Sequence, residues 1–265
     1  MKILPILLGL GFVLSFTSCT TYYYSQLRSN NIEVAKADDG QLVIENDTLS
    51  IAYTFYGENA PITISIFNKI NRPLFVDWSN SAIIIDDIVT TYKDPDGYET
   101  TSGEYNVGGS FSDWKNNDST INSDTISKNA QFIAPKAKIT YTPLELADFS
   151  FEKYFKKEYT KRKIDSKKGK KEIKTKNFTE ENSPLNFISY LTIYDPANPS
   201  EPIFFEQEFY ISELTKAGNI APEHFPEKPE NNTFYVKKEK GKKFLKTVTA
   251  ISIAIIGFSI ELLVN

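Results

Sequence analysis

The chain has a single cysteine, Cys19, and a single histidine, His224. One cysteine excludes an intramolecular disulfide, and one histidine excludes every metal site that needs several imidazole ligands. The sequence also lacks a glycine-rich phosphate loop and the Gly-x-Ser-x-Gly turn of serine hydrolases. His224 lies between two prolines, a context typical of an exposed turn. We therefore expect no metal, no cofactor and no catalytic residue, and a protein that is not an enzyme.

An excess of one charge is also lacking, since 30 Lys or Arg stand against 34 Asp or Glu and the net charge is −4. So small a net charge does not force a chain to expand, and 40% hydrophobic with 14% aromatic residues is too rich for disorder. A length of 265 residues corresponds to one or two domains. We therefore expect a folded protein with a substantial core.

Residues 1–18 have the pattern of a secretory signal peptide. A short basic start precedes an apolar run over residues 3–16, and two small residues stand directly before Cys19. The apolar run is too short for a comfortable membrane span, so we expect the segment to be removed. Residues 19–40 lack apolar periodicity over most of their length, which predicts a tether.

The residues Thr17, Ser18 and Cys19 resemble the lipobox of bacterial lipoproteins, in which the cysteine is diacylated and becomes the first residue of the mature chain. Phe16 departs from the usual leucine, so the motif is relaxed. Together with the tyrosine-rich start it resembles the uncharacterised lipoproteins of Bacteroidota. This resemblance implies lipidation of Cys19 with palmitate-type chains and, because no acidic residue follows before Glu33, a periplasm-facing envelope protein. The alternative is an ordinary signal peptide with an incidental cysteine.

Residues 41–215 carry the pattern of short antiparallel strands. Apolar residues alternate with small or polar ones over residues 49–55 and 62–67. The runs 187–194 and 203–211 flank a turn with two prolines and form the clearest hairpin. About eight such strands without a long helical period predict a mainly β fold, an antiparallel β-sandwich of the immunoglobulin or fibronectin type III kind. A barrel is the alternative.

Within this domain, residues 64–81 resemble the part of Bacteroidota lipoproteins in which a strand, a polar turn and a second strand ending in Val-Asp precede a serine. The likeness implies fold and compartment and brings no activity with it. Three Asp-Ser/Thr sequences are also similar to the O-glycosylation acceptor pattern of the same group. They imply candidate acceptors at Thr48, Ser119 and Thr125.

Residues 101–129 are dominated by Ser, Gly, Asn and Asp and predict a long exposed loop. Three aromatic residues in it, Tyr105, Phe111 and Trp114, are candidate contacts for a ligand such as a sugar ring. The alternative is that Trp114 anchors the loop against a core that contains Trp78.

A basic insertion over residues 150–180 interrupts the strands. Residues 153–176 hold twelve Lys or Arg against three acids. Such a block is usually a solvated, flexible segment. The alternative is contact with anionic headgroups, for which Lys167, Lys168, Lys170 and Lys171 are the candidates. Nucleic acid is not expected as a partner, because no aromatic groove accompanies the charge.

The C-terminal part begins with residues 216–246, whose Pro- and Lys-rich composition predicts a linker. Residues 247–264 follow as an apolar segment interrupted only by Glu261. As a helix it would be slightly short for a bilayer. The lysines before it also stand against the positive-inside preference if Cys19 is translocated. A transmembrane helix, an interfacial helix and a helix that packs on a partner therefore remain open.

These features together favour a non-enzymatic, membrane-tethered β-sandwich of the cell envelope. It would be attached by acylated Cys19 and the 247–264 helix and would interact with an envelope protein or a glycan. One alternative is an envelope enzyme that acts on glycan or peptidoglycan through carboxylates that no spacing identifies. The other is a structural subunit of a membrane assembly.

Overall fold

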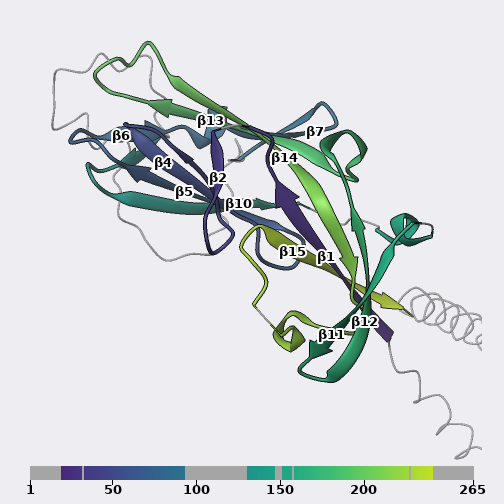
Figure 1. Cartoon of the computed structure of the whole chain (residues 1–265). Helices are drawn as coiled ribbons and strands as arrows, with labels where there is room; N and C mark the ends of the chain where they lie inside the picture. Colours follow the sequence, from purple (N-terminus) through teal and green to yellow (C-terminus); the bar gives the residue numbers. More distant parts are fainter. Residues whose placement is uncertain are drawn as a thin grey trace, which may run out of the picture.

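The computed structural model describes residues 19–31, 33–92, 130–146, 151–156, 158–226 and 228–240. In these ranges the regular structure consists of antiparallel β-strands and four short 3-10 helices, so the prediction of a mainly β fold is confirmed (Figure 1). The short helices are η1 (Trp78–Asn80), η2 (Glu152–Phe155), η3 (Glu180–Asn182) and η4 (Pro222–His224).

The larger sheet has ten strands and is built around the long strand β14. One edge of β14 pairs with β1, which in turn pairs with β15, and the other edge pairs first with β13 and then with β12. The members are β1 (Cys19–Arg28), β6 (Leu74–Val76), β7 (Ala82–Ile85), β8 (Ile88–Thr91), β9 (Gln131–Ile133), β11 (Thr160–Ser166), β12 (Gly169–Asn177), β13 (Asn186–Tyr194), β14 (Ile203–Lys216) and β15 (Thr233–Lys240).

The smaller sheet has five strands in the order β10-β5-β4-β3-β2. Its members are β2 (Val34–Lys36), β3 (Leu42–Glu45), β4 (Leu49–Thr54), β5 (Pro61–Asn68) and β10 (Lys138–Glu145). Buried and half-buried positions alternate strictly in β4. This is the period-two pattern that predicted half-buried strands, and the predicted hairpin of 187–194 with 203–211 is likewise found as β13 and β14.

The two sheets share one hydrophobic core, which fits a β-sandwich. Its centre is aromatic: the Phe209 ring of β14 lies 5.0 Å from Tyr53 of β4, 5.4 Å from Phe55 and 5.2 Å from Phe187, between ring centroids. Trp78 is also buried in this core, as predicted.

A buried polar cluster crosses the core. The hydroxyl of Tyr92 donates to Ser189 Oγ at 2.7 Å, and the Tyr53 hydroxyl lies 3.0 Å from the same oxygen. Burial raises the pKa of both tyrosines, although their hydrogen bonds to Ser189 act in the opposite direction. One serine thus satisfies two tyrosine hydroxyls that have no access to water.

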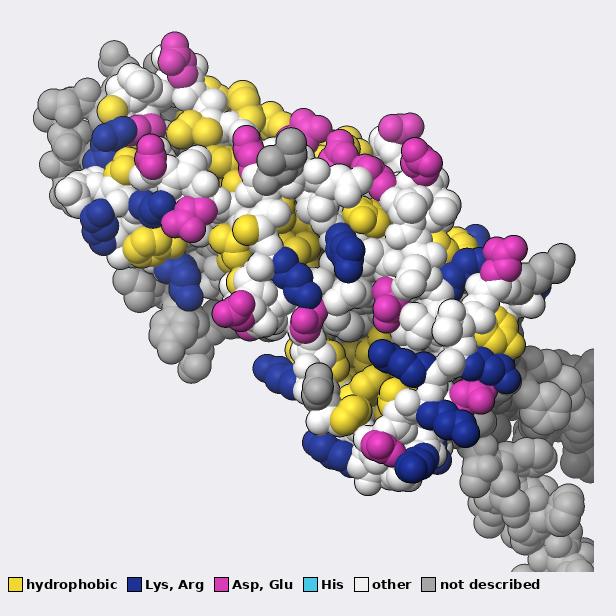
Figure 2. All heavy atoms as spheres, in the orientation of Figure 1, with side chains coloured by type: hydrophobic (Ala, Val, Ile, Leu, Met, Phe, Trp, Pro, Cys, Tyr) yellow, Lys and Arg dark blue, Asp and Glu magenta, His cyan; other side chains and the backbone are white. Residues whose placement is uncertain are grey.

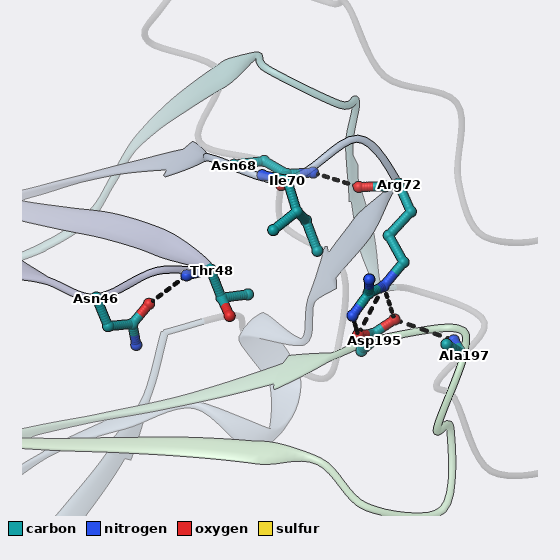
Figure 3. A network of polar contacts seen from close by, with 7 residues as sticks. All are labelled: Asn46, Thr48, Asn68, Ile70, Arg72, Asp195 and Ala197. Atoms are coloured by element: carbon teal, nitrogen blue, oxygen red, sulfur yellow. Dashed lines mark hydrogen bonds and ion pairs between the residues drawn. The ribbon is translucent and has the colours of Figure 1, made fainter.

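An ion pair joins the turn after β5 to the turn after β13 (Figure 3). Arg72, between β5 and β6, donates to both carboxylate oxygens of Asp195 at 2.6 to 3.0 Å. Asp195 follows β13 and also accepts from the backbone N–H of Ala197. Burial on its own would raise the pKa of Asp195, but these donors hold it below its ordinary value. The pair therefore fixes the β13–β14 turn to the turn after β5.

The larger sheet extends beyond the smaller one, toward the end where β1, β11, β12 and β15 lie (Figure 1). There, short segments replace the second sheet. Phe151 and Phe155, at η2, cover one face of β1, and the chain around η4 covers the other face through Ile220 and Phe225.

The structure differs from the sequence-based predictions in this extended part. Cys19–Arg28 is a strand paired on both edges, where a tether was predicted for residues 19–40. The basic insertion, predicted to be flexible, contains the paired strands β11 and β12. The predicted linker over 216–246 contains η4 and β15. Sequence patterns over single segments do not reveal these pairings, because each strand depends on partners far away in the chain.

Within the described ranges, no helix is both long and apolar enough to cross a bilayer. The predicted signal peptide over 1–18 and the predicted helix over 247–264 lie outside these ranges.

Candidate functional site: the basic end of the larger sheet

The two ends of the described chain meet at one end of the larger sheet. β1 begins at Cys19 and β15 ends at Lys240, and these two residues are opposite each other in the antiparallel register. Neighbouring strands lie about 4.8 Å apart. The first and last residues that the structure describes therefore lie side by side.

β1 is held firmly at this end because it is covered on both faces. The Tyr23 ring lies 5.9 Å from Phe155 on one face, and the Tyr24 ring lies 4.6 Å from Phe225 on the other. The Tyr24 hydroxyl donates to the carbonyl of Ile220 at 2.8 Å. Burial, reinforced by the negative charge of Glu152, raises the pKa of Tyr23 to about 12. Between Cys19 and the folded domain there is thus no flexible spacer.

Strand β1 was not predicted, although its composition contains a signal for a strand. Residues 20–24 are Thr and Tyr, which are both favoured in strands because they fit a pleated, half-buried surface. In β15, Phe234 and Val236 alternate with more exposed residues, which is a second signal for a strand. What sequence patterns cannot supply is that β1 and β15 pair with each other.

The basic insertion forms a hairpin with a tight turn. Every residue from Thr160 to Ser166 of β11 is opposite a residue of β12. At the turn, Ser166 Oγ donates to the carbonyl of Gly169 at 2.7 Å and accepts from Lys168 N–H at 3.2 Å. Gly169 has φ of +92°, which suits glycine. Lys167, Lys168, Lys170 and Lys171, the candidates for the alternative of contact with anionic groups, are thereby brought together at the tip.

The register places this tip at the same end as Cys19. β1 and β12 pair with opposite edges of β14, and Tyr23 and Lys174 are both opposite Lys216. β1 and β12 run in the same direction, because both are antiparallel to β14. Cys19 is four residues before Tyr23, and Lys170 is four residues before Lys174, so Lys170 lies level with Cys19. The tip is also fastened to η4, since Lys167 N–H donates to the carbonyl of His224 at 3.0 Å.

Several cations of this end are neutralised, but those of the tip are not. Glu172 pairs with Lys161 at 3.2 Å, and Lys237 and Lys238 pair with Glu239 and Glu152 at 2.9 and 3.1 Å. Among the described side chains, no ion pair within 4.0 Å involves the four tip lysines. Figure 2 shows Lys and Arg side chains gathered at this end around an apolar patch.

An open hollow lies beside the tip, between β15 and the chain around η4. It has a volume of about 390 Å³. Aromatic and proline side chains form most of its wall, and three charged residues stand among them. The lining residues are Tyr56, Lys167, Pro222, Glu223, Phe225, Pro226, Lys228, Pro229 and Tyr235. The end therefore combines amphipathic aromatic rings with cations.

Of the other predicted site residues, Thr48 is described by the structure, and it lies away from this end. Thr48 lies in the turn between β3 and β4, where Asn46 Oδ1 accepts from its backbone N–H at 2.9 Å, and its side chain is partly exposed (Figure 3). Tyr105, Phe111, Trp114, Ser119 and Thr125 lie outside the described ranges.

The two buried carboxylates of the described chain both serve the fold. Asp195 pairs with Arg72 as described above. Asp77 caps η1, where it accepts from the backbone N–H groups of Ser79 and Asn80 at 3.0 and 3.2 Å. In the described ranges, no three His, Cys, Asp or Glu side chains are grouped so that they could hold a metal ion.

Comparison of the chain with protein-family models, with curated proteins and with solved structures gave no match.

Proposed function

We propose that this chain is a non-enzymatic lipoprotein of the bacterial cell envelope, facing the periplasm. Its folded part would be a β-sandwich of the immunoglobulin or fibronectin type III kind, held at a membrane by acylated Cys19 and the 247–264 helix. The observation that carries the proposal is the pairing of Cys19 with Lys240. It gives both proposed anchors a common starting point.

The short segment between Lys240 and the proposed 247–264 helix supports attachment of both anchors to the same bilayer. Position 247 is seven residues after Lys240 and so lies at most about 25 Å from it. Lys240 is opposite Cys19 on a neighbouring strand, about 5 Å away, so the apolar segment starts within about 30 Å of Cys19. Two attachments so close together serve the same membrane surface. Because one acyl chain gives only marginal binding while two hold firmly, a diacylated Cys19 would be a stable anchor by itself. The 247–264 helix would add a second attachment at the same end.

The edge strand β8 of the larger sheet supports a role in binding another protein. Ile88 and Val89 of the edge strand β8 are 69% and 61% exposed. In the described ranges β8 pairs only with β7. Large apolar side chains on an edge strand are typical of surfaces that bind another chain. A protein partner is therefore favoured over a glycan by what the structure describes.

The enzyme alternative has less support. An envelope hydrolase would need convergent carboxylates with altered pKa values, whereas Asp77 and Asp195 are each occupied by hydrogen bonds that hold loops in place. The third possibility, a structural subunit of a membrane assembly, predicts a stoichiometric partner that is lost when residues 247–265 are deleted.

The proposal is tested by metabolic labelling with a palmitate analogue, followed by membrane fractionation. Wild type, Cys19→Ala, a deletion of 247–265 and the combination are compared, with Thr20→Ala as a control that leaves the cysteine intact. We expect the label to disappear with Cys19→Ala, and membrane attachment to be lost only in the combined variant. Absence of label in wild type would overturn the lipoprotein proposal.

A further inference from the structure

We infer that the tip of the β11–β12 hairpin rests on the phosphate-bearing headgroups of an anionic bilayer and so sets the orientation of the domain. The inference rests on the proposed function, because it takes the membrane to lie at the end where Cys19 and Lys240 meet. The ligand chemistry is the phosphate group of an anionic lipid such as phosphatidylglycerol.

Charge complementarity is the first argument. The two strands and their turn, Thr160 to Asn177, contain nine Lys or Arg against two acids, Asp165 and Glu172. Glu172 pairs with Lys161, and Asp165 is opposite Lys170 without an ion pair within 4.0 Å. The positive charge of the tip is thus largely uncompensated within the described chain, and an anionic surface attracts such a cluster.

Position is the second argument. The tip lies level with Cys19, and β12 is joined to β14 over Lys174–Asn177. With its turn bound to the His224 carbonyl, the hairpin presents its lysines as part of the sheet and not as a loose arm. A membrane that holds acylated Cys19 or the segment after Lys240 is therefore within reach of the lysines as well.

The hollow beside the tip is the third argument. Tyr56 and Tyr235 line it together with Lys167 and Lys228, whose Nζ lies 5.8 Å from the centre of the Tyr56 ring. Tyrosine is favoured where one end of a ring meets an apolar phase and the other meets water. Aromatic rings flanked by lysines suit the headgroup layer better than open solvent.

The test uses the full chain reconstituted in vesicles of phosphatidylcholine alone, or with about 30% phosphatidylglycerol. An amine-reactive probe is applied, and labelling of each lysine is followed by mass spectrometry. Lys69, Lys136 and Lys138, at the far end near Arg72, serve as internal controls. We expect the four tip lysines to react about fivefold more slowly on anionic vesicles, with the difference lost at high salt and the control lysines unchanged.

A matched pair of variants separates this inference from the anchoring proposal. The tip variant carries Lys167→Gln, Lys168→Gln, Lys170→Gln and Lys171→Gln, and the control carries Gln at Lys69, Lys136 and Lys138. Vesicle flotation reports the anchors, and amide hydrogen exchange of the tip backbone reports its contact with lipid. We expect all proteins to float on both vesicle types, while only the tip variant loses the protection that anionic lipid gives.

Two results would overturn the inference. Equal lysine labelling on neutral and anionic vesicles, with flotation intact, would leave the anchors in place and remove the headgroup contact. If inorganic phosphate without vesicles slows amide hydrogen exchange at the tip, and anionic vesicles slow it no further, the tip binds a free phosphate ion and not a bilayer. If the protein floats on neither vesicle type, the anchoring proposal fails, and the inference fails with it.

Discussion

Where the larger sheet faces the smaller one, its inner side chains are Phe, Ile and Leu, and an entire second sheet covers them. At the other end of the same sheet, tyrosines are mixed with isoleucine and phenylalanine, and short stretches around η2 and η4 provide the cover. The first arrangement buries area evenly along alternating strands. The second depends on single contacts such as that of the Tyr24 hydroxyl with Ile220, 196 residues away. We call the part where the two sheets face each other the covered half, and the part built from β1, β11, β12 and β15 the extended half. The stability of the two halves therefore depends differently on individual residues.

The largest expected effect comes from removing a ring at the centre of the covered half. Phe209→Ala deletes contacts with three aromatic rings and leaves a cavity, so we expect the free energy of unfolding to fall by about 3–5 kcal/mol. Phe225→Ala in the extended half removes a partly exposed ring, and about 1–2 kcal/mol is expected. Urea denaturation of the detergent-solubilised full chain measures both. Equal losses would contradict the distinction between the halves.

Alkaline pH should weaken both halves. Unfolded tyrosines titrate near pH 10, whereas burial raises the pKa of Tyr53 and Tyr92 in the covered half and that of Tyr23, to about 12, in the extended half. Above pH 10 the unfolded state therefore binds fewer protons than the folded state. The free energy of unfolding should fall by about 1.4 kcal/mol per pH unit for each fully buried tyrosine.

A denaturation series from about pH 9 to pH 11 measures this dependence. The Tyr92→Phe variant should show a flatter slope, since it lacks one of the titrating groups. A slope that is the same in wild type and variant would argue against a pKa shift at Tyr92.

Two glycines with positive φ, Gly40 and Gly169, differ in the space that is free around an added Cβ. Gly40 has φ of +87°, and an added Cβ would lie 2.5 Å from Glu230 Cβ and 2.8 Å from the backbone nitrogen of Asn231. Gly40→Ala should therefore cost about 2–3 kcal/mol through backbone strain and overlap. Gly169 at the hairpin tip has φ of +92° with no atom within 4 Å of that Cβ, so Gly169→Ala should cost about 1 kcal/mol. Thermal or urea unfolding distinguishes the two.

A small effect is expected at the buried polar cluster of Tyr53, Tyr92 and Ser189, where the two sheets face each other. Ser189→Ala removes the shared partner of two buried tyrosine hydroxyls, and we expect a loss of about 1–2 kcal/mol. Ser65→Ala is the control, because its hydroxyl bonds Thr140 Oγ1 at 2.9 Å in an exposed position and should change stability by less than about 0.5 kcal/mol. Similar values for both would mean that Ser189 does not bridge the tyrosines in solution.

The covered half could largely be predicted from the sequence. Alternation in residues 49–54 and 62–67 corresponds to β4 and β5, and the turn with two prolines lies between β13 and β14. In each case, the signal lies within a few residues of the feature that it predicts.

The basic end could be predicted only in part. The four lysines were identified by the charge excess around them, but their common position at a hairpin tip was not. The hollow is lined by residues from position 56 to position 235, and no local pattern connects these positions. The strand that begins at Cys19 was not predicted, because its lack of apolar alternation conceals the strand preference of its Tyr and Thr residues.

The sequence by itself determined that the chain is mainly β, where most turns fall and which segments are basic or apolar, because these properties depend on side chains next to one another in the chain. Only the tertiary structure decided that β1 lies between β14 and β15, that Cys19 is opposite Lys240 and that the lysine tip stands level with them. Strand pairing between distant segments depends on which surfaces remain to be covered once the whole chain has folded. That choice of partners creates the single end on which the proposed membrane attachment rests.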